Sequence, residues 1–241
     1  MKYPVLYNED CLTTMMKMLD QSISLVLADP PYGVTANNWD SRVDFLSEAL
    51  RIGKVVVVTA TQPYSSMLIA RSMYAFRYEW IWHKTSATGF LNAKRQPLRA
   101  HEHVLVFSRG RPPYWPQMSH GNKPTNRYTK HTSDGSNYGR TKIGVSGGGN
   151  TTRYPRSVIT FGKDKQKSSL HPTQKPLELF KYLINTYTKE GDTVYDPFMG
   201  SGTAAVAAKD LGREFIGSEI SNDYYNTAMI RLAETRVGSK E

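Results

Sequence analysis

The sequence predicts an α/β protein with a doubly wound, mostly parallel sheet and an inserted basic region. Apolar runs rich in β-branched residues alternate along the chain with segments of helical periodicity, a pattern typical of parallel strands covered by helices. The alternation stops between residues 109 and 170, where Gly, Asn, Ser, Thr, Tyr and basic residues replace the apolar pattern. We therefore expect one α/β domain formed by residues 1–108 and 171–241, interrupted by a region of different character.

The first half of the chain shows the alternation most clearly. Short β-branched runs predict the strands, the clearest being the valines of residues 55–59, and apolar residues at helical spacing predict the helices. In chain order we expect a strand at residues 5–10, a helix at 13–19, a strand at 23–29, a helix at 43–52, a strand at 55–59, a helix at 64–74 and strands at 78–83 and 104–108.

In the second half, proline and glycine mark where helices begin and end. Pro176 opens a helix to about residue 188, because proline favours the first helical position. Gly212 closes a helix over residues 202–211. We expect strands at residues 193–198 and 214–220 on either side of that helix, and a final helix from residue 223 to about residue 236.

Length and composition limit the class of protein. A chain of 241 residues with 39% hydrophobic residues can bury a core of ordinary size. No apolar run approaches the roughly 18 residues of a membrane span, and the first ten residues lack a signal-peptide pattern, so we expect a cytoplasmic protein without a membrane partner. Cys11 is the only cysteine, which excludes an internal disulfide, a cysteine zinc site and an iron–sulfur cluster. The histidines show no HxxxH spacing, and we expect no metal.

The positive charge is concentrated in the region 109–170. Twelve bases stand there against two acids, Asp134 and Asp164, so this region carries the whole net charge of +10. Tyrosines and a tryptophan are interleaved with the bases, which suits a polyanion, most simply nucleic acid; the alternative is a solvated surface. The candidate nucleic-acid-binding residues are Trp115 and the bases Arg109, Arg111, Lys123, Arg127, Lys130, Arg140, Lys142, Arg153, Arg156, Lys163, Lys165 and Lys167.

The stretch 25–33, Leu-Val-Leu-Ala-Asp-Pro-Pro-Tyr-Gly, reads as a buried strand that ends in a rigid corner. One interpretation is that two prolines simply stop the strand, because proline lacks the amide donor that a sheet needs. The other is that the corner fixes the Asp29 carboxylate, a proline carbonyl and the Tyr32 ring toward one point. That point lies beyond the carboxyl end of the strand, where open α/β sheets bind their ligands.

A second strand end is glycine-rich. The stretch 195–203, Tyr-Asp-Pro-Phe-Met-Gly-Ser-Gly-Thr, runs from a strand into a helix, and glycines there let the backbone approach a ligand closely. No lysine follows Gly202, which excludes the phosphate-binding Walker pattern, and the spacing does not fit the dinucleotide fingerprint. Glu219 ends the next strand, where a doubly wound fold places the acid that binds ribose hydroxyls. The implied ligand has a ribose and needs no pyrophosphate.

Together, the two strand ends resemble the amino-group DNA methyltransferases. Asp29-Pro30-Pro31-Tyr32 resembles their catalytic motif, and the stretch from Asp196 to Thr203 resembles their S-adenosylmethionine motif. The catalytic motif comes first and the basic region lies between the two, an order similar to that of the permuted beta class. The segments 8–12, 101–107 and 171–176 are similar to further pieces of that class. The resemblance implies a circularly permuted, Rossmann-like methyltransferase fold in which residues 109–170 recognise the target.

The resemblance also implies a reaction. A methyl group passes from S-adenosylmethionine to the N6 amine of an adenine flipped out of duplex DNA, without a covalent enzyme intermediate. The amine is a poor nucleophile because its lone pair is delocalised into the ring. By resemblance, the Asp29 carboxylate and the Pro30 carbonyl accept its hydrogens, Pro31 keeps the corner rigid and Tyr32 stacks on the base.

The cofactor contacts follow from the same resemblance. Lys175 closes over the methionine carboxylate or belongs to the basic recognition surface. The other implied contacts are Asp10 and Cys11 with the adenine, Glu219 with the ribose, and Asp196, Pro197, Phe198, Gly200, Ser201, Gly202 and Thr203 with the methionine portion.

Several alternatives stay open. Cytosine N4 is the second choice of target, because many enzymes of that specificity resemble Ser-Pro-Pro-Tyr where this chain has an acid. An RNA amino-methyltransferase or a DNA-binding module without turnover is less favoured, whereas cytosine C5 chemistry is disfavoured because it needs a nucleophilic cysteine in a Pro-Cys turn. A homodimer is expected because one compact recognition region covers little duplex. Whether a cognate restriction endonuclease accompanies the protein stays open.

Overall fold

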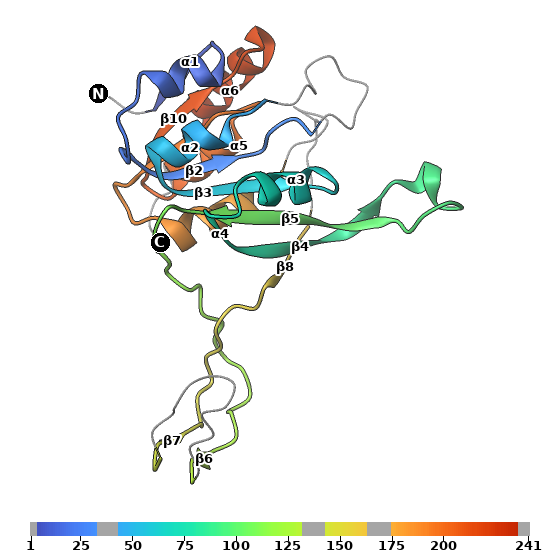
Figure 1. Ribbon diagram of the computed structural model, residues 1–241, viewed down its shortest axis with the longest axis vertical. Coiled ribbons are helices and arrows are strands. Elements are labelled where there is room, and N and C mark those ends of the chain that lie inside the picture. The colour runs from blue at the N-terminus through green and yellow to red at the C-terminus, as the bar shows by residue number, and fades with distance from the viewer. Residues whose placement is uncertain (1–3, 33–42, 132–142, 163–174, 236–241) are drawn as a thin grey trace. The chain divides into compact units, whose positions relative to one another are not determined.

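The computed structural model describes residues 4–32, 43–131, 143–162 and 175–235 (Figure 1). The chain divides into two compact units. The main unit comprises Met1–Trp115 and Ser157–Glu241, and the inserted unit comprises Pro116–Arg156. The inserted unit is shorter at both ends than the predicted region 109–170, because residues up to Trp115 and from Ser157 onward belong with the main unit.

The main unit is built on one eight-stranded sheet. Its strands in spatial order are β1 (Val5–Tyr7), β10 (Glu214–Ser218), β9 (Thr193–Asp196), β2 (Ile23–Ala28), β3 (Gly53–Ala60), β5 (Arg99–Phe107), β4 (Phe76–Thr88) and β8 (Val158–Phe161). Only β5 runs against its neighbours in this sheet; the other strands are mutually parallel. The predicted doubly wound, mostly parallel sheet is therefore confirmed.

Helices cover both faces of the sheet, as Figure 1 shows. They are α1 (Cys11–Met16), α2 (Leu46–Ile52), α3 (Tyr64–Arg71), α4 (Leu177–Tyr187), α5 (Thr203–Asp210) and α6 (Asn222–Glu234). The alternating side chains of β3 explain the two layers: Val55 and Val57 pack with α4, α5 and α6, whereas Val56 and Val58 pack with α1, α2 and α3. Each face of the sheet thus has its own apolar core.

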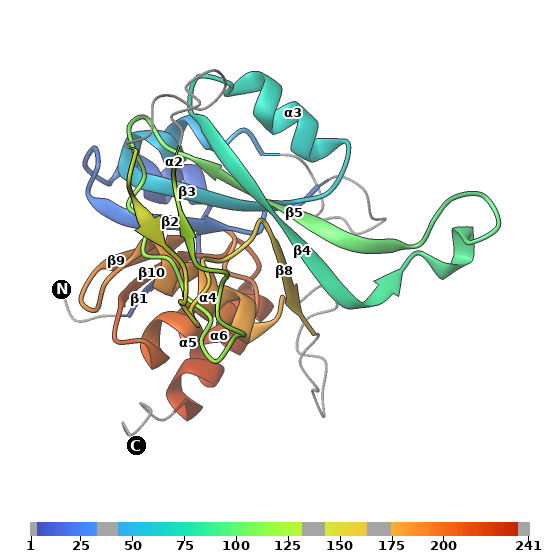
Figure 2. The same cartoon turned by 90° about the horizontal axis from the view of Figure 1, so that it is seen from below.

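The largest differences from the predicted elements concern β4, β5 and β8. Smaller ones lie elsewhere: β1 ends at Tyr7 instead of residue 10, α1 spans Cys11–Met16 instead of residues 13–19, and α3 ends at Arg71 instead of residue 74. β4 and β5 are longer than predicted because they continue past the other strands as a two-stranded hairpin, which Figure 2 shows extending from the main unit. The short helix η1 (Phe90–Asn92) lies at its end. β8 was not predicted, since its four residues lie within the basic region and have no clear apolar alternation.

The winding of the sheet reverses between β2 and β9. They are parallel neighbours, with Leu25 opposite Val194 and Val26 opposite Tyr195. From β2 the chain passes through α2 to β3 on one side, and from β9 it passes through α5 to β10 on the other. The connections diverge and leave the carboxyl ends of β2 and β9 open, which is where ligands bind in such sheets.

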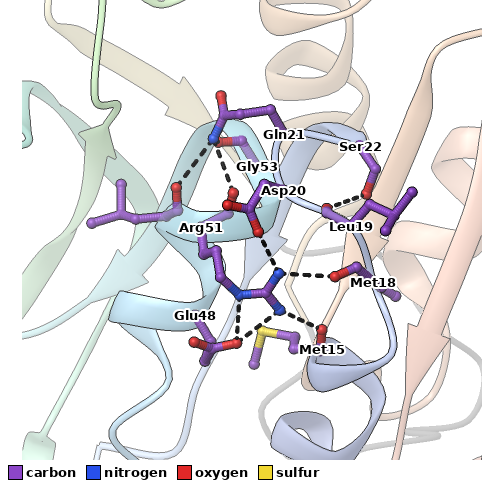
Figure 3. Close-up of polar contacts among 10 residues, drawn as sticks. Met15, Met18, Leu19, Asp20, Gln21, Ser22, Glu48, Arg51 and Gly53 are labelled. Atoms are coloured by element: carbon purple, nitrogen blue, oxygen red, sulfur yellow. Dashed lines mark hydrogen bonds and ion pairs between the residues drawn. The ribbon is translucent and has the colours of Figure 1, made fainter.

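A single arginine ties the start of β2 to α2 (Figure 3). The Arg51 guanidinium donates to the carbonyl oxygens of Met15 and Met18 at 2.8 and 2.9 Å, and it pairs with Asp20 at 2.7 Å and Glu48 at 2.9 Å. These carboxylates raise the pKa of Arg51, with Asp20 contributing most. The contacts fix the turn that leads from α1 into β2.

In the described part of the chain, no helix combines the length and apolar character required to span a bilayer.

Replacing Arg51 by Ala should lower the free energy of unfolding by about 2 kcal/mol, because two carbonyl oxygens and two carboxylates lose their donor. Denaturant unfolding measures the change. Arg71→Ala is the matched control, since Arg71 is exposed at the end of α3 and its loss should cost less than about 0.5 kcal/mol. If the two variants lost equal free energy of unfolding, the contacts of Arg51 would not be what stabilises this turn.

Candidate active site

Asp29 follows β2 directly and is held by three side chains. Its Oδ1 accepts from the Thr59 hydroxyl at the end of β3, lies 2.8 Å from the Tyr32 hydroxyl and lies 2.7 Å from Lys175 Nζ. Its Oδ2 accepts from Lys175 at 2.8 Å. Among the described residues Oδ2 has no other partner, so one of its lone pairs remains for a ligand. The carboxylate is therefore fixed in direction and keeps one open acceptor position.

Lys175 lies in the interior and belongs to a chain of charges. Its side chain is 7% exposed, and Nζ lies 3.5 Å from Glu102, which in turn pairs with Lys84 at 2.5 Å. Burial alone would lower the pKa of Lys175, but Asp29, Tyr32 and Glu102 raise it well above the usual value. Lys175 is therefore a buried cation that faces the Asp29 carboxylate.

The two prolines and Tyr32 complete the corner. Pro30 is buried, and Pro31 and Tyr32 are half-buried. The Tyr32 ring lies 5.7 Å from the ring of Tyr64, and Lys175 Nζ lies 5.5 Å from its centre. Burial, and secondarily the Asp29 charge, raises the pKa of Tyr32 well above its usual value, so its hydroxyl remains a hydrogen-bond donor at neutral pH.

The glycine-rich stretch leaves β9 at the same edge. The amide of Phe198 donates to Asp196 at 2.9 Å, and the Phe198 ring packs edge-on against Phe45 at 4.9 Å. Gly202 has a φ of +82°, and a Cβ there would lie 3.0 Å from the Cβ of Ala228. A side chain at this position would both strain the backbone and press on α6, which explains the glycine.

The rest of this stretch is buried. Ser201 and Thr203 are 3% and 6% exposed, and the Arg231 guanidinium donates to the Thr203 hydroxyl at 3.0 Å. Pro197 lies between Asp196 and Phe198, at the turn of the chain out of β9. The loop is therefore fixed by contacts from α6 as well as by its own backbone.

Glu219 follows β10 and faces the glycine-rich stretch. Its carboxylate accepts from the amide of Gly200 at 2.8 Å and from that of Ser221 at 2.8 Å. Burial raises the pKa of Glu219, and these amides act against that shift. The sequence placed this acid at the strand end, and the structure brings it into hydrogen-bond contact with the loop from β9.

Three carboxylates thus gather at the open edge. Burial is the main cause that raises the pKa of Asp196 well above its usual value, and the charges of Asp29 and Glu219 raise it further. A ligand with positive charge would relieve this repulsion, and one with a diol could donate to Glu219. The acids therefore fit a cationic, ribose-containing molecule better than a phosphate.

Asp10 and Cys11 begin α1. The Asp10 carboxylate caps this helix by accepting from the amides of Leu12 at 2.8 Å and Thr13 at 3.4 Å. Cys11 is 5% exposed, and burial, followed by the Asp10 charge, raises the pKa of its thiol to about 12. The thiol is protonated at neutral pH and is not a nucleophile.

The inserted unit presents some of the predicted nucleic-acid-binding residues. It holds the two-stranded sheet of β6 (Tyr128–Thr129) and β7 (Ser146–Gly147), with an open groove of about 450 Å³ beside it. Lys123, Arg127 and Arg156 are exposed, and Lys130 is half-buried. Arg153 is half-buried and donates to carbonyl oxygens of its own unit, including those of Lys123 and Asn150.

The remaining candidates lie elsewhere. Arg109 and Arg111 follow β5 and are exposed on the main unit. Trp115 also belongs to the main unit, where its amide donates to Thr186 at 2.8 Å and Lys189 Nζ lies 5.2 Å from its ring centre. Arg140, Lys142, Lys163, Lys165 and Lys167 lie outside the described residues.

Thr59, Lys84 and Glu102 were not predicted as site residues. Glu102 lies in the segment 101–107 and precedes the predicted strand at residues 104–108. Without the register of β4 and β5, the sequence gives no sign that its carboxylate lies near Lys175. Lys175 itself was expected to bind a cofactor or belong to a basic surface, and the structure places it against Asp29. Within the described ranges, no cluster of three His, Cys, Asp or Glu residues has the arrangement of a metal site.

Comparison with known proteins identifies relatives over nearly the full chain. A family model described as DNA methylase matches residues 23–230. The type II methyltransferase M1.MboII of Moraxella bovis is 28% identical over 267 residues, covering 96% of this chain and 97% of the relative. The DNA adenine methyltransferase YhdJ of Escherichia coli is 26% identical, covering 92% of this chain and 80% of the relative.

Solved structures share the fold. The complex of M1.HpyAVI with SAM has a TM-score of 0.62 at 21% identity, covering 95% of this chain and 99% of that one. The PvuII DNA methyltransferase, described as cytosine-N4-specific, has a TM-score of 0.66 at 18% identity, covering 97% and 87%.

Replacing Asp196 by Asn should stabilise the protein without ligand at neutral pH, because the variant removes a buried charge and keeps an oxygen for the Phe198 amide. Since the pKa of Asp196 is raised by folding, the wild type should lose stability relative to the variant as the pH rises above about 4. We expect a Tm at least about 2 °C higher for the variant at pH 7.5, and equal values below pH 4. Asp223→Asn, an exposed control, should show no such trend. A destabilised Asp196→Asn variant at pH 7.5 would contradict this account.

Proposed function

Because the chain belongs to the family of S-adenosylmethionine-dependent DNA methylases that act on amino groups, we propose that it methylates adenine N6 in duplex DNA. The observation that carries this proposal is the Asp29 carboxylate, with one open acceptor position at the edge where the winding of the sheet reverses. S-adenosylmethionine, when bound, supplies a methyl group on a sulfonium centre. The protein must orient the amine toward that group and stabilise the charge that develops on nitrogen.

Asp29 and Pro30 activate the amine. A carboxylate oxygen and a carbonyl oxygen that accept its two hydrogens draw the nitrogen toward a tetrahedral geometry and localise its lone pair. The same acceptors stabilise the positive charge that develops as the new bond forms. Oδ2 of Asp29 is the acceptor of choice, because Oδ1 is already engaged by Thr59, Tyr32 and Lys175.

Lys175 acts through Asp29. Its ammonium contacts both carboxylate oxygens, at 2.7 and 2.8 Å, so the plane of the carboxylate is fixed before a base arrives. Glu102 balances the charge of Lys175 and is itself paired with Lys84. We therefore assign Lys175 as a positioning residue rather than a contact for the methionine carboxylate.

The acids on the other side of the edge suit the cofactor. Asp196 and the backbone from Phe198 to Thr203 would hold the methionine portion, and Glu219 retains lone pairs for ribose hydroxyls. Asp10 and Cys11 would lie near the adenine, at the start of α1. These assignments rest on family resemblance and on the common edge of the strands.

The adenine target rests on the identity of residue 29. Enzymes of cytosine N4 specificity often resemble Ser-Pro-Pro-Tyr, and this chain has an aspartate. The named relatives include a DNA adenine methyltransferase and a cytosine-N4-specific enzyme, so cytosine N4 is the second candidate. Cytosine C5 chemistry is disfavoured further, because the Cys11 thiol has a pKa of about 12.

Duplex DNA would be read by the inserted unit and its exposed bases, among them Lys123, Arg127 and Arg156. Basic side chains on an irregular unit suit phosphate contacts, which fix the register of a protein on the duplex. The names of relatives as type II methyltransferases support a restriction–modification setting, in which a cognate endonuclease cuts the unmethylated sequence.

The reaction is tested by incubating duplex DNA with the protein and methyl-labelled S-adenosylmethionine, then identifying the labelled nucleoside. We expect N6-methyladenine from the wild type. Asp29→Ala should bind the cofactor normally and lose methyl transfer by at least about a hundredfold, because it lacks an acceptor for the developing charge. Asp223→Ala, an exposed acid on α6, should retain full activity.

Label in N4-methylcytosine would overturn the choice of base and retain the mechanism. Near-normal transfer by Asp29→Ala would overturn the role of the carboxylate.

Replacing Lys175 by Ala distinguishes its two candidate roles. As a positioning residue, its loss should slow methyl transfer at saturating cofactor by about 10- to 100-fold and leave the Kd for S-adenosylmethionine unchanged. Isothermal titration and single-turnover rates measure the two quantities. A raised Kd with a normal rate at saturation would instead make Lys175 a cofactor contact.

A dimer is expected in solution, because one compact recognition unit covers little duplex. Sedimentation equilibrium at micromolar concentration, with and without DNA, measures the state. A monomer under both conditions would contradict the expectation.

A further inference from the structure

The end of the β4–β5 hairpin exposes large apolar side chains. We define the hairpin tip as residues 89–99. Leu91 is 99% exposed, Phe90 is 82% exposed and Leu98 is 42% exposed. Gly89, with a φ of +91°, turns the chain into η1, which presents Phe90 and Leu91 next to each other. Apolar residues concentrated in this way on a projecting element mark an interaction site rather than a core.

The hairpin projects from the edge that carries the candidate active site. β4 runs antiparallel to β5, which runs antiparallel to β3, so β4 points in the same direction as β2 and β3. Its carboxyl end therefore lies on the Asp29 side of the sheet, and β4 continues about 16 Å beyond His83 to Thr88. Figure 2 shows this extension beyond the other strands.

The base of the hairpin is tied to the catalytic acid. Lys84 on β4 pairs with Glu102 on β5, and Glu102 lies 3.5 Å from Lys175, which binds Asp29. One chain of buried charges thus links the base of the hairpin to the carboxylate. A large ligand that is bound at Asp29 and extends along this edge of the sheet would therefore contact the hairpin.

The positive charge of the hairpin tip favours a polyanion as its binding partner. Lys94, Arg95 and Arg99 are exposed, and residues 80–101 contain no Asp or Glu. None of the described residues forms an ion pair with these three bases. A second copy of the chain is disfavoured as the partner, because a twofold contact would bring two tips of equal positive charge together. A duplex supplies phosphates for the bases and stacked bases for the apolar side chains.

We propose that the hairpin tip is a DNA-contacting element separate from the inserted unit. Lys94, Arg95 and Arg99 bind phosphates, and Phe90 and Leu91 enter the stack of bases as an apolar wedge. Wedges of this kind partly unstack the duplex, which lowers the cost of flipping a base out of it. The inference rests on the proposed function for its choice of DNA as ligand, and it adds a residue set that the basic region does not include.

The phosphate contacts are tested by the salt dependence of binding to a mixed-sequence duplex. For Lys94→Gln/Arg95→Gln, the slope of log K against log salt should become less steep by about 2, since each phosphate contact contributes about 0.9. The matched control is Lys54→Gln/Arg71→Gln, which removes two exposed bases from the start of β3 and the end of α3, on the opposite edge of the sheet. An unchanged slope in the tip variant, or an equal change in both variants, would overturn the proposal.

The wedge is tested by the unwinding of closed circular plasmid in the presence of a topoisomerase, which requires neither methyl transfer nor a known target sequence. Wild-type protein should shift the linking number, and Phe90→Ala/Leu91→Ala should reduce that shift at least about threefold. Met73→Ala/Tyr74→Ala removes exposed apolar side chains before β4, on the opposite edge, and should leave it unchanged. A full shift by the tip variant would overturn the wedge.

The outcomes separate the two proposals. If wild-type protein transfers no methyl group but the tip variants still bind and unwind DNA less well, the proposed function fails and the tip remains a DNA contact. If methyl transfer is normal and neither tip variant differs from its control, the function stands and the inference is wrong. A tip variant that loses a dimer in sedimentation while its DNA binding is unchanged would identify a second copy as the partner and overturn the inference.

Discussion

The parallel pairing of β2 with β9 is the constraint on which the site depends. With Val26 opposite Tyr195, the two strands end at the same edge: Asp29 and Pro30 follow β2, and β9 ends at Asp196, with Pro197 after it. Asp29 and Asp196 come from distant parts of the sequence, yet they leave the sheet at one edge because their strands are neighbours. A shift of one residue in this register would turn one set of side chains to the opposite face of the sheet. The cores on both faces, which alternate along β2, therefore also fix the geometry of the site.

The site brings together charges that oppose folding. Asp196 is buried near two other carboxylates, and Lys175 is a buried cation whose cost of burial is offset by Asp29 and Glu102. On one side of the edge the charges are paired, which gives Asp29 a fixed direction. On the other side like charges face each other and await a cationic ligand. The paired charges make Asp29 a preorganised acceptor. The like charges around Asp196 make a binding site that is stabilised when a cationic ligand fills it.

The sequence allowed the fold and the two strand-end motifs to be predicted, because both depend on local pattern. Asp29, Asp196 and Glu219 were recognisable as acids that end apolar runs. Lys84 and Glu102 were not, since their partnership depends on the pairing of Trp82 with Glu102 across two strands. Local composition identified Arg153 as a candidate nucleic-acid contact, and only the folded backbone reveals that its guanidinium also donates to carbonyl oxygens of its own unit. The hairpin tip was missed because its charge is small beside that of the region 109–170.

The way the chain leaves and rejoins the main sheet has a consequence for evolution. β5 precedes the inserted unit and β8 follows it, and both strands pair with β4, on its two sides. The sheet is complete whatever the length or sequence of the segment between them. Substitution, exchange or elongation of that segment leaves the register of β2 and β9 unchanged. The part of the chain proposed to choose a DNA sequence can therefore diversify rapidly under selection while the chemistry of the amine is conserved.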